Sequence, residues 1–421
     1  MAGMARNLKA ILLQNNTSSS SSSSSVWAYI TGLDINRNNA VFVLQSDGAT
    51  GYYPDSPAKT LSPLARDCHI QIGGPGTSRA VTIPQLAGGR IWFCRGAQLR
   101  FQLNPGPALV EPSVTNASDP NYALSWAFAE FTFNAAQVFA NISYVDFVSL
   151  PISLALASED ADTPRQMVPG LPASGLDAVC AELAAQHDRD GAGWNKLIVR
   201  TPPSDGSEFL RALSPNSAMV MDSTLFSSYY QPYVDAVWAK YALTKQPPLT
   251  IDTQNAEWGT AQGQTTTTSP PSPSPPPKSL LTFTLHGGSS TPSPSPSPIS
   301  FPQPSTADIF SCSTGAFAQQ PAAPIRNNIA ARLAAAFNRS TLLINPDQPA
   351  AEKVVTYYAS HPITNHYARV VHAASLPDGK GYAFPYDDVA PDNDASNNVA
   401  GTVADARPRV LVVAEPIKGG R

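Results

Sequence analysis

Residues 123–156, with the sequence ALSWAFAEFTFNAAQVFANISYVDFVSLPISLAL, alternate apolar and polar side chains in two runs. An alternation with a period of two predicts β-strands, in which successive side chains point to opposite faces of a sheet. We expect a loop over residues 134–141 to join the runs and to bring Glu130 opposite Asp146. The side chains expected on the shared faces are Trp126, Phe128, Glu130 and Thr132 in the first run, and Ile142, Tyr144, Asp146 and Val148 in the second.

Two acidic side chains, Glu130 and Asp146, are therefore expected among aromatic neighbours. A carboxylate in apolar surroundings costs free energy or shifts its pKa, so such a pair indicates a cleft that makes use of it. Two carboxylates between aromatic walls suit glycoside hydrolysis, in which one protonates the leaving oxygen and the other activates water or attacks the sugar. Acidic residues also lie on solvated strand faces, so the pair taken alone leaves a purely structural role open.

The remaining apolar runs divide the chain into a β part and a mixed part. Short runs between Gly, Pro and Asn, namely AVFVLQ, VTIPQL, RIWFC and QLRFQL, predict a β-sandwich or barrel up to about Leu156. After Pro164 the apolar spacing becomes helical in residues 174–188, 229–243 and 323–338, which predicts an α/β lobe. We expect the final segments HYARVVHAA, GYAFPY and RVLVVAE to return to the sheet.

Composition excludes several classes of function. The 421 residues carry 27 basic and 31 acidic side chains, a net charge of −4, which gives no nucleic-acid footprint. No apolar run reaches the roughly 18 residues that a membrane-spanning helix needs. The glycine-rich segment at residues 72–78 lacks the GK[ST] ending of a phosphate-binding loop, and His361, His366 and His372 lack an HExxH pattern. We therefore expect no metal, cofactor, nucleic-acid or membrane partner, and a monomer.

Several ordered motifs resemble the β-1,3-glucanases of glycoside hydrolase family 64. They are GGRIWFCRGAQLRF (88–101), AEFTFN (129–134) followed by ANISYVDFVSLPI (140–152), PSTADIFSCSTGAF (304–317) and NHYARVVHAASLPDGKGYAFPYDDV (365–389). The GGRIW and YAFPYDD strings also resemble thaumatin-like proteins, whose fold that family shares. The resemblance runs from about residue 26 to 415. It implies a thaumatin-like β-sandwich or barrel domain plus a mixed α/β domain, with a wide cleft between them.

The resemblance also implies roles for individual residues. Glu130 is expected to be the general acid and Asp146 the general base of an inverting mechanism. Phe139 stands where a tryptophan is expected in bacterial members, so stacking on the sugar should be weaker there. The residues expected to bind substrate are Thr132, Asn134, Phe139, Asp119, Asp387 and Asp388.

Pro/Ser tracts at residues 264–278 and 289–304 flank the strand-like segment SLLTFTLHG. Such tracts usually link domains, but the flanking motifs keep the order of the family, so we expect surface insertions. The predicted organisation is a disordered Ser-rich N-terminus (1–25), a β-sandwich or barrel part with the carboxylates (26–163), an α/β lobe (164–263), Pro/Ser-rich insertions around a short strand (264–304), the continued α/β lobe (305–378) and C-terminal strands returning to the β domain (379–421).

The four cysteines, Cys68, Cys94, Cys180 and Cys312, allow two disulfides. Pairing Cys68 with Cys94 and Cys180 with Cys312 is the first arrangement to consider, and the other two connectivities stay open. The family implies an extracellular or cell-wall location. The N-terminal residues contain only the short apolar stretch AILL, below the roughly 7 to 15 residues of a signal-peptide core.

Three interpretations of function follow. The favoured one is an endo-acting β-1,3-glucanase that hydrolyses glucan to short oligosaccharides without a cofactor. The second is a non-catalytic thaumatin-like protein that binds β-glucan in the same groove, and the presence of both Glu130 and Asp146 argues against it. The third, a structural wall protein, is favoured only by the Pro/Ser tracts. Product length and biological role stay open.

Overall fold

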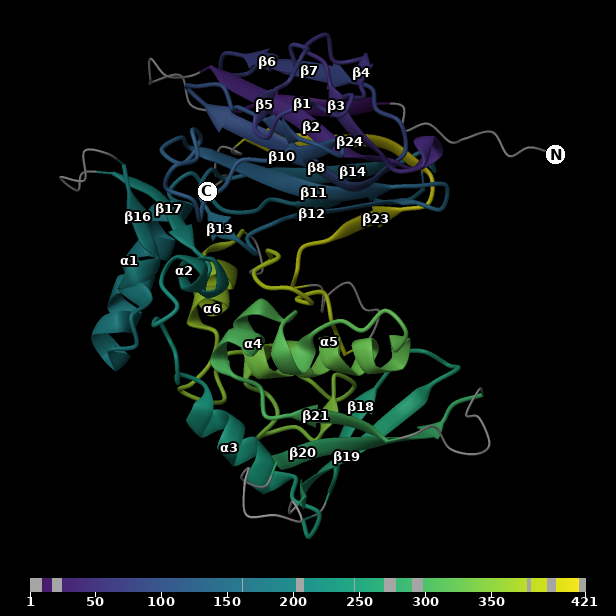
Figure 1. Ribbon diagram of the computed structural model, residues 1–421, viewed down its shortest axis with the longest axis vertical. Coiled ribbons are helices and arrows are strands. Elements are labelled where there is room, and N and C mark those ends of the chain that lie inside the picture. Colours follow the sequence, from purple (N-terminus) through teal and green to yellow (C-terminus); the bar gives the residue numbers. More distant parts are fainter. Residues whose placement is uncertain are drawn as a thin grey trace.

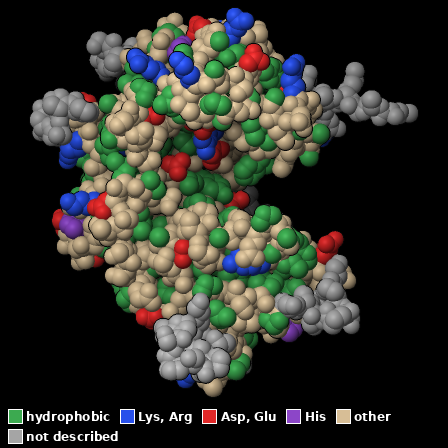
Figure 2. Space-filling model, viewed as in Figure 1, with side chains coloured by type: hydrophobic (Ala, Val, Ile, Leu, Met, Phe, Trp, Pro, Cys, Tyr) green, Lys and Arg blue, Asp and Glu red, His purple; other side chains and the backbone are tan. Residues whose placement is uncertain are grey.

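The computed structural model describes residues 10–16, 25–160, 162–201, 208–245, 247–268, 278–289, 298–376, 380–391 and 399–415. This part of the chain forms two lobes along the longest axis of the molecule, an upper lobe of sheets and a lower lobe of helices and sheets (Figure 1). Figure 2 shows a deep hollow between the lobes, with acidic and basic side chains inside it. The predicted fold class, mainly β with a mixed α/β lobe, is confirmed.

An eight-stranded antiparallel sheet forms the centre of the upper lobe. Its order is β23-β12-β11-β8-β2-β3-β4, with β6 also paired to β2. Gly89 leaves room for the ring of Phe131, its partner on the adjacent strand, because a Cβ at position 89 would lie 2.4 Å from that ring. The strands are β2 (Val26–Asp34), β3 (Ala40–Leu44), β4 (Gly51–Tyr52), β6 (Ile70–Gly73), β8 (Leu86–Arg95), β11 (Trp126–Phe133), β12 (Val138–Ile142) and β23 (Val403–Asp405).

A second sheet of five strands shares one hydrophobic core with the first. It includes residues 10–15, which pair in parallel with residues 410–415, so the expected disorder of residues 1–25 is wrong for this strand. Apolar side chains at Ile11 and Leu13 are fully buried and stabilise the pairing. Residues 1–9 and 17–24 lie outside the described part. The strands are β1 (Ala10–Asn15), β7 (Ser78–Val81), β14 (Ser153–Ser158), β15 (Gln166–Val168) and β24 (Pro408–Glu415).

A small three-stranded sheet covers the aromatic face of the central sheet. The adjoining ring of Phe101 packs against Tyr29 and Trp92, with ring centroids 5.2 and 5.5 Å apart. The strands are β5 (Ser62–Pro63), β9 (Gln102–Asn104) and β10 (Ala108–Val110).

The lower lobe combines helices with a five-stranded sheet, ordered β21-β20-β19-β18-β22, and a three-stranded sheet, ordered β13-β17-β16, lies beside it. The helices are α1 (Gly175–Asp190), α2 (Pro215–Met221), α3 (Gln231–Lys240), α4 (Thr306–Ser311), α5 (Pro324–Arg339), α6 (His366–Ala374) and the short 3₁₀ helices η2 (Trp194–Leu197), η3 (Gly315–Phe317) and η4 (Val354–Thr356). A further 3₁₀ helix, η1 (Ile35–Arg37), connects β2 and β3 in the upper lobe. The strands are β13 (Phe147–Val148), β16 (Ile198–Arg200), β17 (Phe209–Leu213), β18 (Leu249–Asp252), β19 (Gly259–Thr268), β20 (Lys278–Gly287), β21 (Ile299–Pro302) and β22 (Asp347–Gln348).

The three helices expected from apolar periodicity are confirmed as α1, α3 and α5. The segment HYARVVHAA, expected in the sheet, is instead helix α6, whose N-cap Asn365 accepts a hydrogen bond from the Ala368 amide. The segment GYAFPY is also not a strand, since only Tyr382 forms a β-bridge, with Ser143. RVLVVAE is the expected strand, β24.

The Pro/Ser tracts fall mostly at residues 269–277 and 290–297, outside the described residues. The strands that border them are antiparallel neighbours in one sheet, β19 with β20 and β20 with β21. Both tracts therefore connect adjacent strands within the lower lobe.

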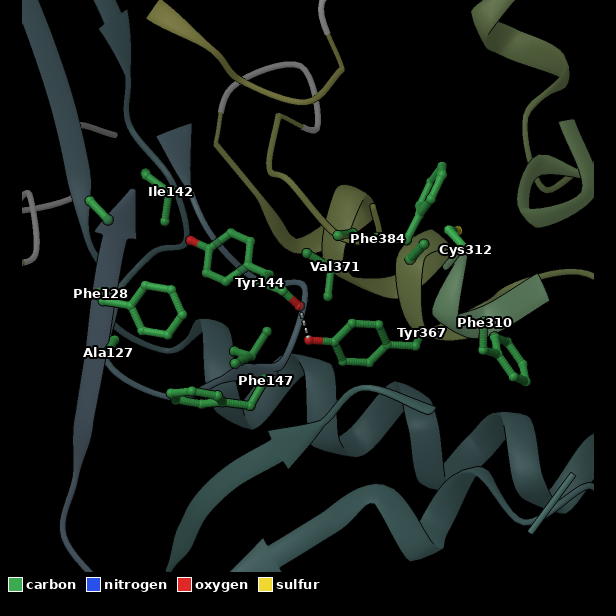
Figure 3. Close-up of a cluster of buried hydrophobic side chains, with 14 of the residues drawn as sticks. Ala127, Phe128, Ile142, Tyr144, Phe147, Phe310, Cys312, Tyr367, Val371 and Phe384 are labelled. Atoms are coloured by element: carbon green, nitrogen blue, oxygen red, sulfur yellow. Dashed lines mark hydrogen bonds between the residues drawn. The ribbon is translucent and has the colours of Figure 1, made fainter. Parts of the chain in front are cut away.

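The two lobes are joined through buried aromatic side chains at the end of β12. Figure 3 shows Tyr144 between the sheet residues Phe128 and Ile142 and the α6 residues Tyr367 and Val371. The Tyr367 hydroxyl donates to the Tyr144 carbonyl at 2.6 Å. In the part of the chain that the structure covers, no helix is long and apolar enough to cross a membrane.

The disulfides considered from the sequence do not form, and that prediction is wrong. All four cysteines are buried thiols. Cys180 lies in α1, whereas Cys312 ends α4 and its thiol donates to the Ile309 carbonyl at 3.3 Å. Cys94 lies in β8, and Cys68 precedes β6. Burial raises the pKa of both Cys68 and Cys180 to about 12, so these thiols stay protonated.

Candidate active site

A row of polar side chains crosses four strands of the central sheet. The register pairs Thr31 of β2 with Arg90 of β8, Arg90 with Glu130 of β11, and Glu130 with Asn141 of β12. Directly paired residues share a face of the sheet. The expected alternation in β11 is therefore correct, and Glu130 stands on the same face as the packed rings of Trp126 and Phe128.

Arg90 is held between two carboxylates. Its guanidinium lies 3.3 Å from Glu130 Oε1 and forms a short ion pair with Glu111, which follows β10. The guanidinium carbon also lies 4.9 Å from the ring centre of Phe128. All three charged side chains are partly open, with 30% to 34% of the side-chain surface exposed. The cluster carries one net negative charge when both carboxylates are ionised.

Asp146 lies beside this cluster at the junction of the lobes, and its carbonyl accepts from the Ser214 amide at 2.9 Å. Burial raises the pKa of the Asp146 carboxyl, the negative charge of Glu130 raises it further, and Arg90 partly opposes them. The Asp146 carboxyl therefore lies close enough to Glu130 to sense its charge. The chain leaves the sheet after β12 and passes to the junction of the lobes. This path brings together the two carboxyls, Glu130 and Asp146, that the sequence analysis identified.

The route by which Asp146 reaches Glu130 differs from the expectation. The hairpin between β11 and β12 is tight, with the Asn134 amide donating to the Gln137 carbonyl at 3.0 Å, so no loop extends over residues 134–141. In this register Glu130 faces Asn141 instead of Asp146. The strand ends at Ile142, and the chain turns out of the sheet before β13 begins at Phe147. The second run is therefore not one continuous strand.

A cavity of about 530 Å³ opens over this face of the sheet. Thr132 and Phe139, both expected to bind substrate, are paired across β11 and β12 and line it together with Glu130. Its other walls come from β2, β3, β8, β10, β11 and β12 and from Glu111 after β10. These residues are Gly32, Leu33, Val41, Gly88, Gly89, Arg90, Leu109, Glu111, Phe131 and Asn141. A cavity with apolar walls and a few polar groups suits a ligand that has both apolar faces and hydroxyl groups.

Asn134 stabilises the tight hairpin between β11 and β12. Its side-chain oxygen accepts from the amides of Ala136 and Gln137 at 2.8 and 3.0 Å, which fixes the turn. The residue lies at the end of β11, outside the set that lines the cavity.

The predicted pair Asp387 and Asp388 separates in the structure. Asp387 is 1% exposed and pairs with Arg339 and His372, so the expectation that it faces a sugar cleft is wrong. Burial opposes its ionisation, but His372 and Arg339 outweigh burial and hold the pKa of Asp387 below its ordinary value. The YAFPYDDV segment thus uses its first aspartate to fix the lower lobe.

Asp388 is exposed and accepts from the Tyr382 hydroxyl at 2.8 Å. The Tyr382 backbone pairs with the end of β12, because its carbonyl accepts from the Tyr144 amide at 2.8 Å. Burial and the carboxylates of Asp388, Asp387 and Glu130 raise the pKa of Tyr382, so the phenol is neutral. Tyr382 and Asp388 therefore lie next to the end of β12, where Tyr382 also senses the charge of Glu130.

Asp119, a further predicted sugar ligand, lies in the loop before β11. Its carboxylate accepts from the Asn121 backbone and side-chain amides at 2.7 and 2.9 Å. Asn121 in turn fixes the backbone of Arg100. Asp119 is not among the residues that line the cavity.

Arg90, Glu111, Asn141 and Tyr382 belong to the site but were not predicted. The sequence did hold a signal for Arg90, which lies in the GGRIW motif at the start of the predicted strand RIWFC. Glu111 and Tyr382 come from irregular segments, and no periodicity indicates where such side chains point.

Comparison with known proteins places the chain in a family. The model of glycoside hydrolase family 64, described as β-1,3-glucanase, matches residues 8–414. The chain therefore belongs to this family of glycoside hydrolases, and the resemblance noted from the sequence motifs is confirmed. Its thaumatin-like aspect stays a prediction.

Curated relatives agree with this assignment. Glucan endo-1,3-β-glucosidases of Cellulosimicrobium cellulans and of Arthrobacter sp. (strain YCWD3) are each 28% identical over 313 residues, or 74% of this chain. The match covers 50% of each relative, so the chain spans about half their length.

Solved structures share the fold. A laminaripentaose-producing β-1,3-glucanase in complex with laminaritetraose superposes with a TM-score of 0.76 at 28% identity, over 98% of this chain and 99% of the other. A β-1,3-glucanase domain from Clostridium beijerinckii, at 19% identity, gives a TM-score of 0.68 over 97% and 98% of the two chains and shows the same fold.

Proposed function

We propose that this protein is an endo-acting β-1,3-glucanase that hydrolyses laminarin-like glucan to short oligosaccharides with inversion at the anomeric carbon. The observation that carries the proposal is the coupling of the Glu130 and Asp146 carboxyls beside a cavity with aromatic and polar walls. Membership of the β-1,3-glucanase family supports the substrate class. A structural relative at 28% identity binds laminaritetraose, which also supports it.

In the proposed reaction Glu130 gives its proton to the glycosidic oxygen as the bond to the anomeric carbon breaks. Asp146 removes a proton from a water molecule, whose oxygen attacks that carbon from the opposite side and leaves the new hydroxyl in the α configuration. Glu130 ends ionised and Asp146 protonated, and exchange with solvent restores both. The geometry that we propose is a carboxyl separation of about 6 to 10 Å, which leaves room for the water.

Glu111 makes the acid role of Glu130 chemically reasonable. A carboxyl beside an unshared arginine is stabilised in its ionised form, which cannot donate a proton. Here Arg90 forms its short ion pair with Glu111, so part of its charge is already balanced when it meets Glu130. Glu111 is therefore a positioning residue that acts through Arg90.

The reverse assignment of acid and base is the competing mechanism. It is favoured by one observation, the raised pKa of Asp146, because a carboxyl that keeps its proton is suited to act as the acid. Rescue by a small anion separates the two. Azide should restore turnover to Asp146→Ala if Asp146 is the base, and to Glu130→Ala if the roles are reversed.

Thr132, Phe139 and Asp388 are proposed to bind glucan. Thr132 and Phe139 line the cavity, and Asp388 is exposed beside Tyr382. We also propose that the enzyme acts as a monomer outside the cell or in a cell wall, because a glucan polymer is too large to reach an internal enzyme. Fractionation of the native source would test the location, and light scattering the monomer.

The deciding experiment measures reducing ends released from laminarin, with product sizing and NMR of the first anomer formed. Glu130→Gln and Asp146→Asn should each lower turnover by something like 10²- to 10⁴-fold, while glucan binding is retained. Glu257→Gln, at an exposed carboxylate in the lower lobe, is the matched control. If the wild-type protein binds laminarin but releases no more reducing ends than Glu130→Gln, the protein is a glucan-binding module. A β-anomer as first product would exclude inversion.

A further inference from the structure

A second cavity of about 310 Å³ lies on the upper lobe, separate from the Glu130 site. It opens on the same face of the central sheet, since Tyr29 lines it and Thr31 of the same strand belongs to the polar row of the Glu130 site. The small sheet stands between the two cavities: Leu109 of β10 reaches the first, and Gln102 of β9 reaches the second. The two cavities share no lining residue.

Two arginines give the second cavity its charge. Arg66 and Arg100, both exposed, line it, and within the described residues no carboxylate forms an ion pair with either. The whole chain carries a net charge of −4. Two guanidinium groups without an ion-pair partner at one cavity are therefore a local excess of positive charge on an acidic protein. Asn121 fixes the backbone of Arg100, donating to its carbonyl at 2.9 Å and accepting from its amide at 2.7 Å.

His69 also lines this cavity, and its ring orientation is fixed. Its Nδ1 lies 2.7 Å from Asp67 Oδ1, and the same oxygen accepts from the His69 backbone amide at 3.0 Å. The ring packs edge-to-face against Trp27 and Tyr29 at 6.5 and 5.5 Å. With Nδ1 committed to Asp67, Nε2 is the nitrogen left for a ligand.

The rest of the lining is apolar or neutral. Tyr29 and Phe101 supply ring surface, and Pro63, Leu64 and Leu99 complete the walls. Cys68 also lines the cavity, and its raised pKa of about 12 keeps it uncharged. A flat ligand body can pack on these surfaces while its polar groups meet the arginines and His69.

We propose that this cavity is a second binding site, for a sugar-sized hydroxylated carboxylate of the hexuronate type. The two guanidinium groups match a carboxylate, which accepts paired hydrogen bonds in the fork geometry of arginine. His69 Nε2, the ring nitrogen that does not contact Asp67, meets a ligand hydroxyl, and Tyr29 and Phe101 pack against the sugar ring. A neutral glucan would leave both arginines without an anionic partner, so the site is distinct in chemistry from the glucan cleft.

Isothermal titration calorimetry with D-glucuronate, and with D-glucose as the uncharged match, tests the proposal on the full chain. Glucuronate should bind and glucose should bind at least tenfold more weakly. The double variant Arg66→Gln/Arg100→Gln should lose at least tenfold in glucuronate affinity, and added NaCl should weaken binding by the wild type. Arg407→Gln, at an exposed arginine paired with Asp160, is the control and should bind as the wild type does. A methyl glycoside of glucuronate distinguishes a uronate within a polymer from the free acid, because its anomeric oxygen is blocked.

Several results would overturn the assignment. They are no heat of binding with glucuronate, equal affinity for glucose, or a folded double variant that keeps wild-type affinity. Competitive inhibition of laminarin hydrolysis by glucuronate would show that the acid occupies the Glu130 cavity, and this too would overturn it. Failure of laminarin hydrolysis itself leaves the uronate titration unaffected, so the two proposals fail separately.

Discussion

Arg90 donates to Glu130 at 3.3 Å across β8 and β11, and the same guanidinium is shared with Glu111 from the far side. The Glu130 carboxyl therefore faces a cation whose charge is partly balanced. Asp146, which follows the point where the chain leaves the sheet, is close enough to sense the charges of both Arg90 and Glu130. This unequal sharing of one arginine leads to the first two predictions.

Glu111→Gln is expected to lower kcat on laminarin about tenfold at neutral pH. Arg90 is then left to Glu130 alone, and an arginine next to a single carboxylate favours the ionised form, which cannot donate a proton. The lost activity should return on acidification, whereas KM changes little. A kcat–pH profile measured beside Glu257→Gln checks this. Equal profiles for Glu111→Gln and the wild type would show that Glu111 has no influence on the acid.

The acid side of the activity profile should be set by Asp146. Burial and Glu130 raise the pKa of this carboxyl, and a general base works only when ionised. Activity is therefore expected to fall, as pH decreases, at a pH above the ordinary aspartate value of about 3.9. Asp146→Glu, which keeps a carboxyl at a shifted position, should move this limb, while Asp146→Asn should remove the activity. A limb that stays in place in Asp146→Glu would assign it to another group.

Acid should weaken the fold through His366. Burial lowers its pKa from 6.5 to about 4, and the neutral ring donates from Nε2 to the Pro362 carbonyl while Nδ1 accepts from Arg369. The unfolded chain binds the proton at higher pH than the native state does, so stability falls as pH decreases from about 6.5 to about 4. The full effect is about 3 kcal/mol. Chemical denaturation across this range should show a shallower decrease for His366→Gln; an identical slope would refute the assignment.

Asn134→Ala should cost stability through the hairpin. The substitution removes the two hydrogen bonds to the amides of Ala136 and Gln137, a loss of about 1 to 2 kcal/mol. We expect some turnover to persist and the product distribution to broaden, because Thr132 and Phe139 stand on the strands that this turn joins. Denaturant melts and product sizing test both parts. A variant as inactive as Glu130→Gln, with unchanged stability, would place Asn134 in the catalytic site.

Arg339→Met should be far more damaging than a surface change. Its guanidinium is fully buried and pairs with Glu352 at 3.5 Å and Asp387 at 3.3 Å. Without it two buried carboxylates lose their partner, which typically costs about 3 to 5 kcal/mol. Thermal unfolding should show this loss, and Arg407→Gln serves as the exposed comparison. A small change in the melting temperature would mean that the network tolerates an uncompensated charge.

The sequence predicted those parts of the fold that depend on local periodicity. Helix α5 was found because its apolar residues recur at helical spacing, and β11 because Glu130 alternates with aromatic side chains. Helix α6 was missed although Tyr367, Val370 and Val371 have helical spacing, because the segment is short and β-branched residues also suit strands. The run VTIPQL lies mostly between strands, since β7 ends at Val81 and β8 begins at Leu86.

The site was predicted in part for the same reason. Glu130, Thr132 and Phe139 occupy faces that alternation fixes. Asp387 was misplaced because its partner Arg339 is distant in the sequence, and no local pattern shows that a carboxylate will be buried against such a partner. Asp146 reaches Glu130 through a bend that follows Ile142, and the geometry of that bend depends on the packing of Tyr144 against α6.

The parallel pairing of β1 with β24 has a consequence for biosynthesis. Strand β24 is translated after every other described element, yet it separates β1 from β14 in the five-stranded sheet. The upper lobe therefore cannot complete this sheet while the ribosome is still working on residues before 408. Until then β1 and β14 expose unpaired edges, which are the kind of surface that chaperones bind and that promotes aggregation. The lower lobe lies between them in sequence, so it has time to fold first.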